Sequence, residues 1–133
     1  MTISEQWIKW EPIKNLAPKY YIDSISDNID EFSITLSDAD NKNKIKVTFE
    51  TLVLSYRSTN ESFRLSIIKY LDECNIEYSK WTFFKIINST YIQWLSEQSY
   101  GIIESIPPTH FSFVAGDSIV DVIAVYEPKV DFI

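Results

Sequence analysis

Residue types that carry chemistry are scarce in this chain. Its 133 residues include one histidine, His110, one cysteine, Cys74, and two glycines, Gly101 and Gly116. So few glycines argue against the glycine-rich loops with which proteins cradle phosphate groups. A structural zinc site needs about four nitrogen or sulfur ligands, and a single cysteine cannot form an internal disulfide. We therefore expect no cofactor and no metal, and the lone thiol fits a reducing compartment.

Positive charge is also in short supply. Twelve Lys and Arg against nineteen Asp and Glu give a formal net charge of −7. A negative field repels phosphate backbones, and aromatic stacking platforms for single strands are normally paired with a cationic groove. We therefore expect no direct nucleic-acid partner, and a basic protein is the better match.

Long apolar runs are missing as well. No stretch approaches the roughly 20 apolar residues that a membrane span needs. Residues 1–10 lack the cationic start and the long apolar run of a secretory signal. We expect a soluble, cytoplasmic protein that has no membrane partner.

Aromatic residues are the abundant class. They make up 15% of the chain, within a hydrophobic total of 45% and a charged total of 23%. These proportions are typical of a globular protein with a large core, and one domain commonly holds about 100 to 150 residues. With no repeat, low-complexity tract or linker, we predict a single domain over residues 1–133.

Alternating hydrophobicity predicts a β-hairpin. Residues 31–37 and 44–50 both alternate apolar and polar side chains, which is the period of a half-buried strand. The polar residues 38–43 between them form a turn, so the two strands should pair antiparallel. Further strands are predicted at residues 19–26, 81–87, 110–115 and 129–133. Residues 1–18 are expected to be irregular and pinned to the body by burial of Trp7 and Trp10.

Capping patterns predict the helices. The run Ser58-Thr59-Asn60-Glu61 matches a capping box, so a helix should begin at Ser58 and run to about Glu73, with Cys74 on its apolar face. Ser89 is a suitable N-cap for a short helix that ends at Gly101.

The segment 118–126 is ambiguous between a helix and a strand. Gly116 and Asp117 offer cap chemistry and Pro128 a stop, which favours a helix, but the same Val and Ile run also fits a buried strand. The elements together predict an α+β fold, with a mostly antiparallel β-sheet and two or three packed α-helices.

Candidate catalytic groups are few. A Cys–His nucleophilic pair could be built only from Cys74 and His110, and it would also need a third, orienting group. Because a small thiol on an apolar helix face is commonly buried, we interpret Cys74 as structural. The turn at 38–43 resembles the start of a calcium loop but lacks the glycine at its sixth position and the glutamate at its twelfth. We expect no catalytic residue and no metal site.

An acidic window is the clearest surface signal. Between Lys19 and Lys42 the sequence holds no basic residue. The six carboxylates of this window are Asp23, Asp27, Asp30, Glu31, Asp38 and Asp40. Such a patch requires only exposure and a basic partner to act in binding. We predict that it contacts a protein partner together with three aromatic anchors, Tyr21, Trp94 and Tyr100.

The order of several short motifs resembles a family of small bacterial proteins. These motifs are Trp10-Glu11-Pro12-Ile13, Lys19-Tyr20-Tyr21-Ile22, Leu54-Ser55-Tyr56-Arg57-Ser58-Thr59, Ser79-Lys80-Trp81-Thr82-Phe83-Phe84, residues 94–101 and Tyr126-Glu127-Pro128-Lys129-Val130. They are similar to immunity proteins encoded beside polymorphic or contact-dependent growth-inhibition toxins. The resemblance implies a non-catalytic protein that binds and neutralises the C-terminal domain of its cognate toxin, frequently a nuclease. It implies no particular interface residues.

Two other functions fit the residues. One is a small hydrolase that uses a pair of carboxylates, since paired carboxylates are numerous. The other is an acidic adaptor, a protein-interaction module without a toxin partner. A toxin gene directly upstream would favour the immunity hypothesis over both.

Overall fold

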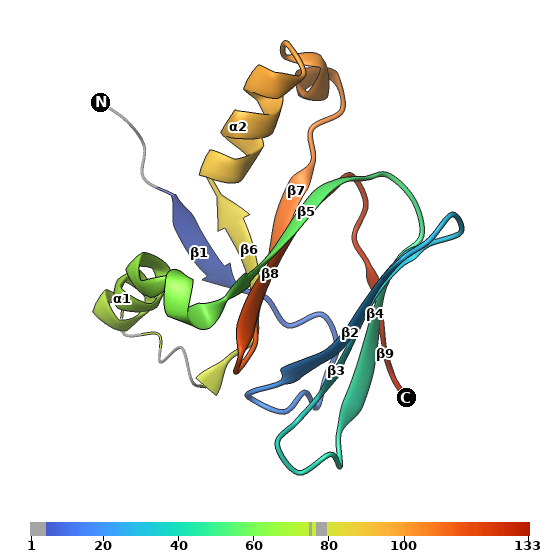
Figure 1. Cartoon of the computed structure of the whole chain (residues 1–133), viewed down its shortest axis with the longest axis vertical. Helices are drawn as coiled ribbons and strands as arrows, with labels where there is room; N and C mark the ends of the chain where they lie inside the picture. The colour runs from blue at the N-terminus through green and yellow to red at the C-terminus, as the bar shows by residue number, and fades with distance from the viewer. Residues whose placement is uncertain (1–4, 75, 77–79) are drawn as a thin grey trace.

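The computed structural model describes residues 5–74, 76 and 80–133, which form two antiparallel β-sheets and two α-helices (Figure 1). One sheet has five strands, in the spatial order β1 (Gln6–Lys9), β6 (Phe83–Ile87), β7 (Thr109–Val114), β8 (Ser118–Ala124) and β5 (Val53–Asn60). The other has four, in the order β2 (Tyr21–Asp27), β3 (Phe32–Ser37), β4 (Lys44–Phe49) and β9 (Lys129–Phe132). The described part of the chain is therefore α+β and mostly sheet, with two sheets where we expected one.

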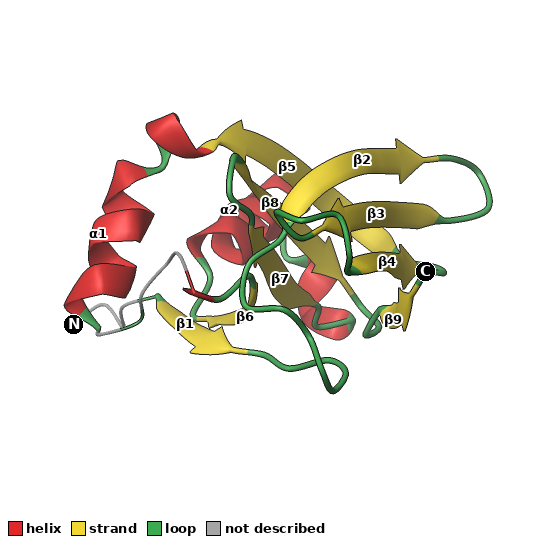
Figure 2. Ribbon diagram, turned by 90° about the horizontal axis from the view of Figure 1, so that it is seen from below, coloured by secondary structure: helices red, strands yellow, loops and turns green. Residues whose placement is uncertain are grey.

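The helices cover the face of the five-stranded sheet that the four-stranded sheet leaves open. Figures 1 and 2 both place α1 (Leu65–Glu73) and the four-stranded sheet on opposite sides of the five-stranded sheet. The second helix, α2 (Thr90–Gln98), is followed by a 3₁₀ turn, η3 (Ile102–Ser105), and another such turn, η1 (Glu61–Phe63), precedes α1. Within the described ranges, no helix has the length and apolar character to cross a lipid bilayer.

Side-chain alternation gives the five-stranded sheet two buried faces, because successive residues of a strand point to opposite sides. One face packs against the four-stranded sheet and holds Phe83, Phe111, Phe113, Val120 and Val122. The other face packs with α1 and holds Phe84, Ile86, Val114 and Ile119. The five-stranded sheet is thus the middle layer of the molecule, and its helix-covered face carries the polar residues described below.

The predicted hairpin is confirmed. The strands β3 and β4 pair antiparallel from Phe32 opposite Phe49 to Ser37 opposite Lys44, with residues 38–43 as the turn. The strands predicted at 81–87, 110–115 and 129–133 correspond to β6, β7 and β9, and that at 19–26 corresponds to β2. The α2 cap is also confirmed, because the Ser89 side chain accepts from the Ile92 amide.

The predicted start of the first helix is wrong. Ser58 lies in β5, where it pairs with Val120 of β8. The ladder to the central strand β8 holds residues 53–60 in an extended conformation and pairs the backbone groups on that side, so the sheet overrides the capping-box pattern. The side chain that caps is Asn60, which accepts from the Ser62 amide of η1, and α1 begins only at Leu65. Its predicted end near Glu73 agrees with the structure.

The segment 118–126 is a strand and not the helix that we favoured. Residues 119–124 of β8 are all buried, and β8 pairs with both β7 and β5. A surface helix would bury only one stripe of these residues, whereas a central strand buries both faces. Gly116 and Asp117 lie in the tight turn between β7 and β8, closed by a bond from the Ala115 amide to the Ser118 carbonyl. Glycine and aspartate are favoured in turns as well as at helix termini, so the two residues that suggested a helix cap are here the residues of a turn.

Two smaller expectations also need correction. Residues 1–18 were expected to be irregular, but residues 6–9 form β1, which pairs with β6. Trp7 and Trp10 are buried, as predicted. Residues 1–4 lie outside the described residues. Cys74 was expected to be buried and is exposed. Cys74 is the C-cap residue of α1, and the two residues before it, Asp72 and Glu73, are exposed as well.

Candidate functional site

The residues predicted to bind a partner occupy three separate places. Asp27, Asp30 and Glu31 lie at the turn between β2 and β3, whereas Tyr21, Asp23, Asp38 and Asp40 lie at the opposite end of the same strands. Tyr21 and Asp27 are the two ends of β2, six residue steps apart, a span of about 20 Å. Trp94 lies on α2, and Tyr100 follows the same helix, beside the other sheet. The acidic window is therefore two patches and not one.

The first patch lines a groove between two turns. We call it the acidic groove, and its volume is about 240 Å³. Its lining residues come from the β2–β3 turn and the β4–β5 turn: Asp27, Asn28, Ile29, Asp30, Glu31, Phe32, Phe49, Glu50, Thr51, Leu52 and Val53. Four of these are carboxylates, and Glu31 is paired with Lys46, at 3.2 Å between Oε1 and Nζ.

Apolar side chains project between these carboxylates. Ile29 is fully exposed and Leu52 is 44% exposed. The Asn28 side chain accepts from the amides of Asp30 and Glu31, so the turn that carries Ile29 is held in one shape. Leu52 has a φ of 52°, a left-handed conformation that is costly for a leucine. Exposed apolar residues on a rigid, locally strained rim are features of a binding surface.

The second patch, at the other end of the hairpin, is bound more closely to its own strands. The Ser37 hydroxyl donates to the Asp23 carboxylate, and the Asp38 carboxylate accepts from the amides of Lys42 and Asn43. Tyr21 packs its ring against Gly116 in the β7–β8 turn. These residues stabilise the β3–β4 turn and join the two sheets.

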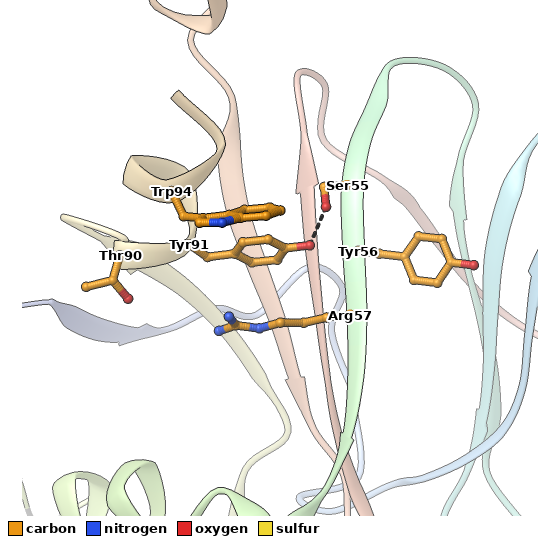
Figure 3. Close-up of a pocket in the computed structure, with 6 residues that line it drawn as sticks. All are labelled: Ser55, Tyr56, Arg57, Thr90, Tyr91 and Trp94. Carbon is orange, nitrogen blue, oxygen red and sulfur yellow. Dashed lines mark hydrogen bonds between the residues drawn. The ribbon is translucent and has the colours of Figure 1, made fainter. Parts of the chain in front are cut away.

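A second pocket lies where α2 faces β5 (Figure 3). We call it the aromatic pocket; its volume is about 550 Å³, and it is lined by Ser55, Tyr56, Arg57, Thr90, Tyr91 and Trp94. Trp94, Tyr91 and the Arg57 guanidinium lie in three layers (Figure 3), with 5.9 Å between the two ring centroids and 4.3 Å from the Arg57 Cζ to the Tyr91 centroid. The Tyr91 hydroxyl is hydrogen bonded to the Ser55 hydroxyl.

Beneath the aromatic pocket runs a buried polar chain. The Ser89 Oγ lies 2.7 Å from Nδ1 of His110, whose Nε2 lies 2.7 Å from Oδ1 of Asp121. The other carboxylate oxygen of Asp121 accepts from Arg57 Nε at 2.9 Å and from Arg64 Nη1 at 2.8 Å. One carboxylate thus receives two guanidinium groups and an imidazole.

Strand register assembles this chain. Arg57 of β5 is paired directly opposite Asp121 of β8, and β7 lies on the other side of β8. Alternation turns His110, Asp121 and Arg57 toward the helices, while Tyr56 points the other way and contacts Phe32 of the four-stranded sheet, with 4.6 Å between their rings. Ser89 is placed beside His110 because it caps α2 at the end of β6.

The electrostatics of Asp121 favour its ionised form. Burial by itself raises the pKa of a carboxyl, but the hydrogen bond from His110 and the charges of His110, Arg64 and Arg57 outweigh it. The pKa of Asp121 is therefore held well below its usual range. For Tyr91 the burial effect prevails, and the pKa of its hydroxyl is raised.

The order serine, histidine, aspartate resembles that of a nucleophilic triad, but these residues are placed for stability. His110 and Asp121 have no exposed surface, and Ser89 is 4% exposed. The Ser89 oxygen also accepts from the Ile92 amide, which ties it to the helix terminus. A nucleophile must reach its substrate and must be free to attack. This serine is enclosed and serves as a helix cap.

The Cys–His pair considered from the sequence is not formed. Both ring nitrogens of His110 are occupied by Ser89 and Asp121, and Cys74 lies exposed at the end of α1. Among the residues that the structure describes, no three His, Cys, Asp or Glu side chains are grouped so that they could hold a metal ion.

Sequence reasoning missed the buried chain and the exposed apolar residue Ile29. A usable signal was Asp121 itself, the single charge in the apolar run 119–124. A buried carboxylate needs a cationic or hydrogen-bonding partner, and the two arginines and the one histidine were the scarce candidates. Ile29 had a signal too, as an isoleucine flanked on both sides by polar turn residues.

Comparison with known proteins gives no match for this chain. No protein-family model matches it, and no curated protein or solved structure is significantly similar to it. The resemblance to immunity proteins therefore stays a prediction.

Proposed function

We propose that this chain is an immunity protein, which binds the toxic C-terminal domain of a cognate toxin in the cytoplasm of the cell that makes both. It acts by covering the toxin's active cleft or substrate-binding surface, so no turnover is required. The toxin domain is basic, as nucleases commonly are, and its charge complements the −7 of this chain.

The observation that supports this proposal best is the acidic groove. It combines four carboxylates with two exposed apolar side chains, Ile29 and Leu52. Exposed charges guide a partner of opposite sign and raise the association rate, while apolar anchors that become buried hold the complex. The groove therefore has both parts of a protein interface, and it lies on turns whose backbone is already fixed.

The proposal is tested with the C-terminal domain of the toxin encoded directly upstream. Surface plasmon resonance at low and high salt should show binding whose association rate falls as salt rises. Asp27→Asn with Asp30→Asn should slow association at low salt by about 3- to 10-fold and flatten the salt dependence. Ile29→Ser should mainly accelerate dissociation.

A matched control lies at the other end of the same hairpin. Asp23→Asn with Asp40→Asn removes the same number of charges, with Asp23 about 13 Å from Asp27 along β2 and Asp40 in the turn at the far end of β3. This variant should leave the association rate close to that of the unaltered protein. Equal effects of the two double variants would show that only net charge matters and that the groove is not the interface. If the unaltered protein does not bind the toxin domain, the immunity function is wrong for that pair.

A further inference from the structure

The aromatic pocket exposes the residue types that dominate protein interfaces. Trp94 is 49% exposed and the Arg57 side chain is 41% exposed, whereas the ring of Tyr56 points to the other face of the sheet (Figure 3). Tryptophan, tyrosine and arginine are the side chains most enriched among binding hot spots, because they bury large areas with little loss of conformational freedom. Here Trp94, Tyr91 and Arg57 lie together in one concave site.

Cationic and anionic side chains meet at this site. The carboxylate of Asp121 faces two guanidinium groups, so Asp121, Arg57 and Arg64 by themselves sum to +1, and the Glu5 carboxylate, which is hydrogen bonded to Thr90, adds one negative charge beside the pocket. Arg57 uses its Nε for Asp121, and its terminal nitrogens have no hydrogen-bond partner in the part of the chain that the structure describes. Positive charge reaches the surface at Arg57, which is the more exposed of the two arginines.

The geometry of Arg57 suits an anion. Stacking on Tyr91 and the ion pair with Asp121 fix the guanidinium plane, and its terminal nitrogens lie under Tyr91 on the side of Thr90 (Figure 3). A fixed guanidinium can donate two parallel hydrogen bonds to a carboxylate, which is a stronger contact than a single charge pair. The Thr90 hydroxyl donates to Glu5, so Arg57 is the donor that the pocket offers.

The aromatic pocket and the acidic groove share one strand. Leu52 and Val53 line the groove, and Ser55, Tyr56 and Arg57 line the pocket a few residues further along β5. Tyr56 contacts Phe32, which also lines the groove, so an aromatic pair connects the two. Four residues of strand from Val53 to Arg57 span about 13 Å along β5. The pocket and the groove lie on opposite faces of the five-stranded sheet, and β5 is its edge strand, so one partner would reach both sites around this edge.

We propose that the aromatic pocket receives an acidic side chain, Asp or Glu, of the protein partner that the acidic groove attracts. The proposal rests on the proposed function for the identity of that partner. The carboxylate pairs with Arg57, and apolar groups beside it cover Trp94 and Tyr91. The partner surface then carries a basic patch and, near it, one carboxylate. Recognition therefore depends on charges of both signs at the spacing that separates the acidic groove from the aromatic pocket.

Two arms test this proposal. In the first, the Trp94 indole signal is followed by NMR while the protein is titrated with acetyl-Leu-Glu-Leu-amide or its Gln counterpart at millimolar concentration. We expect saturable shifts with the Glu peptide, at least about 5-fold weaker binding of the Gln peptide, and loss of the difference in Arg57→Gln. Equal shifts with both peptides, or none that saturate, would overturn the carboxylate assignment.

In the second arm, surface plasmon resonance measures the toxin domain against variants. Arg57→Gln and Trp94→Ala should each weaken binding by about 10- to 100-fold, chiefly through faster dissociation. Trp94→Ala leaves the buried chain intact, so it serves where Arg57→Gln fails to fold. Lys69→Gln is the control, because it removes one positive charge from an exposed side chain of α1.

The outcomes separate the two proposals. Unaltered affinity in both Arg57→Gln and Trp94→Ala, with the unaltered protein bound, would place the aromatic pocket outside the interface while the immunity function stands. No binding of the toxin domain to the unaltered protein would end the immunity function, and the peptide arm would still decide whether the aromatic pocket prefers a carboxylate.

Discussion

Replacing Asp121 by asparagine is the sharpest test of the buried chain. The substitution keeps the shape of the side chain and removes its charge. An asparagine can still accept from His110 through its oxygen, but its amide nitrogen then faces the donors of Arg57 and Arg64. Two guanidinium groups would lose the counter-charge that they share, in a site that has no exposed surface at Asp121.

The expected cost is large. Removing one partner of a buried ion pair typically destabilises a protein by about 3 to 5 kcal/mol, out of a total of about 5 to 15 kcal/mol. With a urea slope near 2 kcal/mol/M, the unfolding midpoint should fall by about 2 M. Asp117→Asn is the control, because Asp117 is exposed in the β7–β8 turn and its substitution should change stability by less than about 0.5 kcal/mol.

The pH dependence adds an independent check. Because the pKa of Asp121 is lower in the folded protein than in the unfolded chain, its contribution is present above the unfolded pKa, near 4, and is lost as the pH falls through the lower folded value. The unaltered protein should therefore lose stability more steeply below pH 4 than Asp121→Asn does. A midpoint shift below about 0.5 M, together with parallel acid titrations of the two proteins, would refute the ionised cluster.

Three further outcomes follow from single contacts. Ser89→Ala removes the α2 cap and a partner of the buried imidazole, so thermal or urea unfolding should show a loss of about 2 to 4 kcal/mol, and a loss under 0.5 kcal/mol would contradict both roles. Gly116→Ala places a methyl group against the Tyr21 ring and should cost about 1 to 3 kcal/mol in the same assay, whereas in a Tyr21→Ala background the cost should vanish. Burial lowers the pKa of Lys19 to about 8, so between pH 8 and 9.5 the unfolded chain binds more protons than the folded protein does. The free energy of unfolding should therefore rise over this range by about 1 to 2 kcal/mol relative to that of Lys19→Met. Parallel pH profiles of the two proteins would contradict this expectation.

The local sequence pattern was enough to predict an element when one of its faces is buried and the residues that pair with it or cap it are close in the sequence. The hairpin of β3 and β4 was readable because period-two alternation and a polar turn act within residues 31–50. The cap of α2 was readable for the same reason, since Ser89 and the amide of Ile92 are three residues apart. Contacts over short sequence distances leave a direct trace in the order of the residues.

Local pattern failed where a distant strand decided the outcome. Ser58 had the chemistry of a helix cap, but pairing with β8 made its segment a strand, and β8 in turn was ambiguous until it was flanked by β5 and β7. A strand that is buried on both faces shows no alternation of apolar and polar residues, so a central strand and a buried helix look alike in sequence. The second sheet was missed because strand order depends on pairings between distant residues.

Charge and composition by themselves pointed to an acidic protein with few chemical groups, and they led to the prediction that Asp27, Asp30, Glu31 and Trp94 contact a partner. Only the tertiary structure could divide the acidic window between two ends of a hairpin. Only it could bring Arg57, Arg64, His110 and Asp121 together, because up to 64 positions separate Arg57 from Asp121 along the chain. The physical reason is register: a shift of one residue in β5 would turn Arg57 to the other face of the sheet and leave Asp121 buried without that partner.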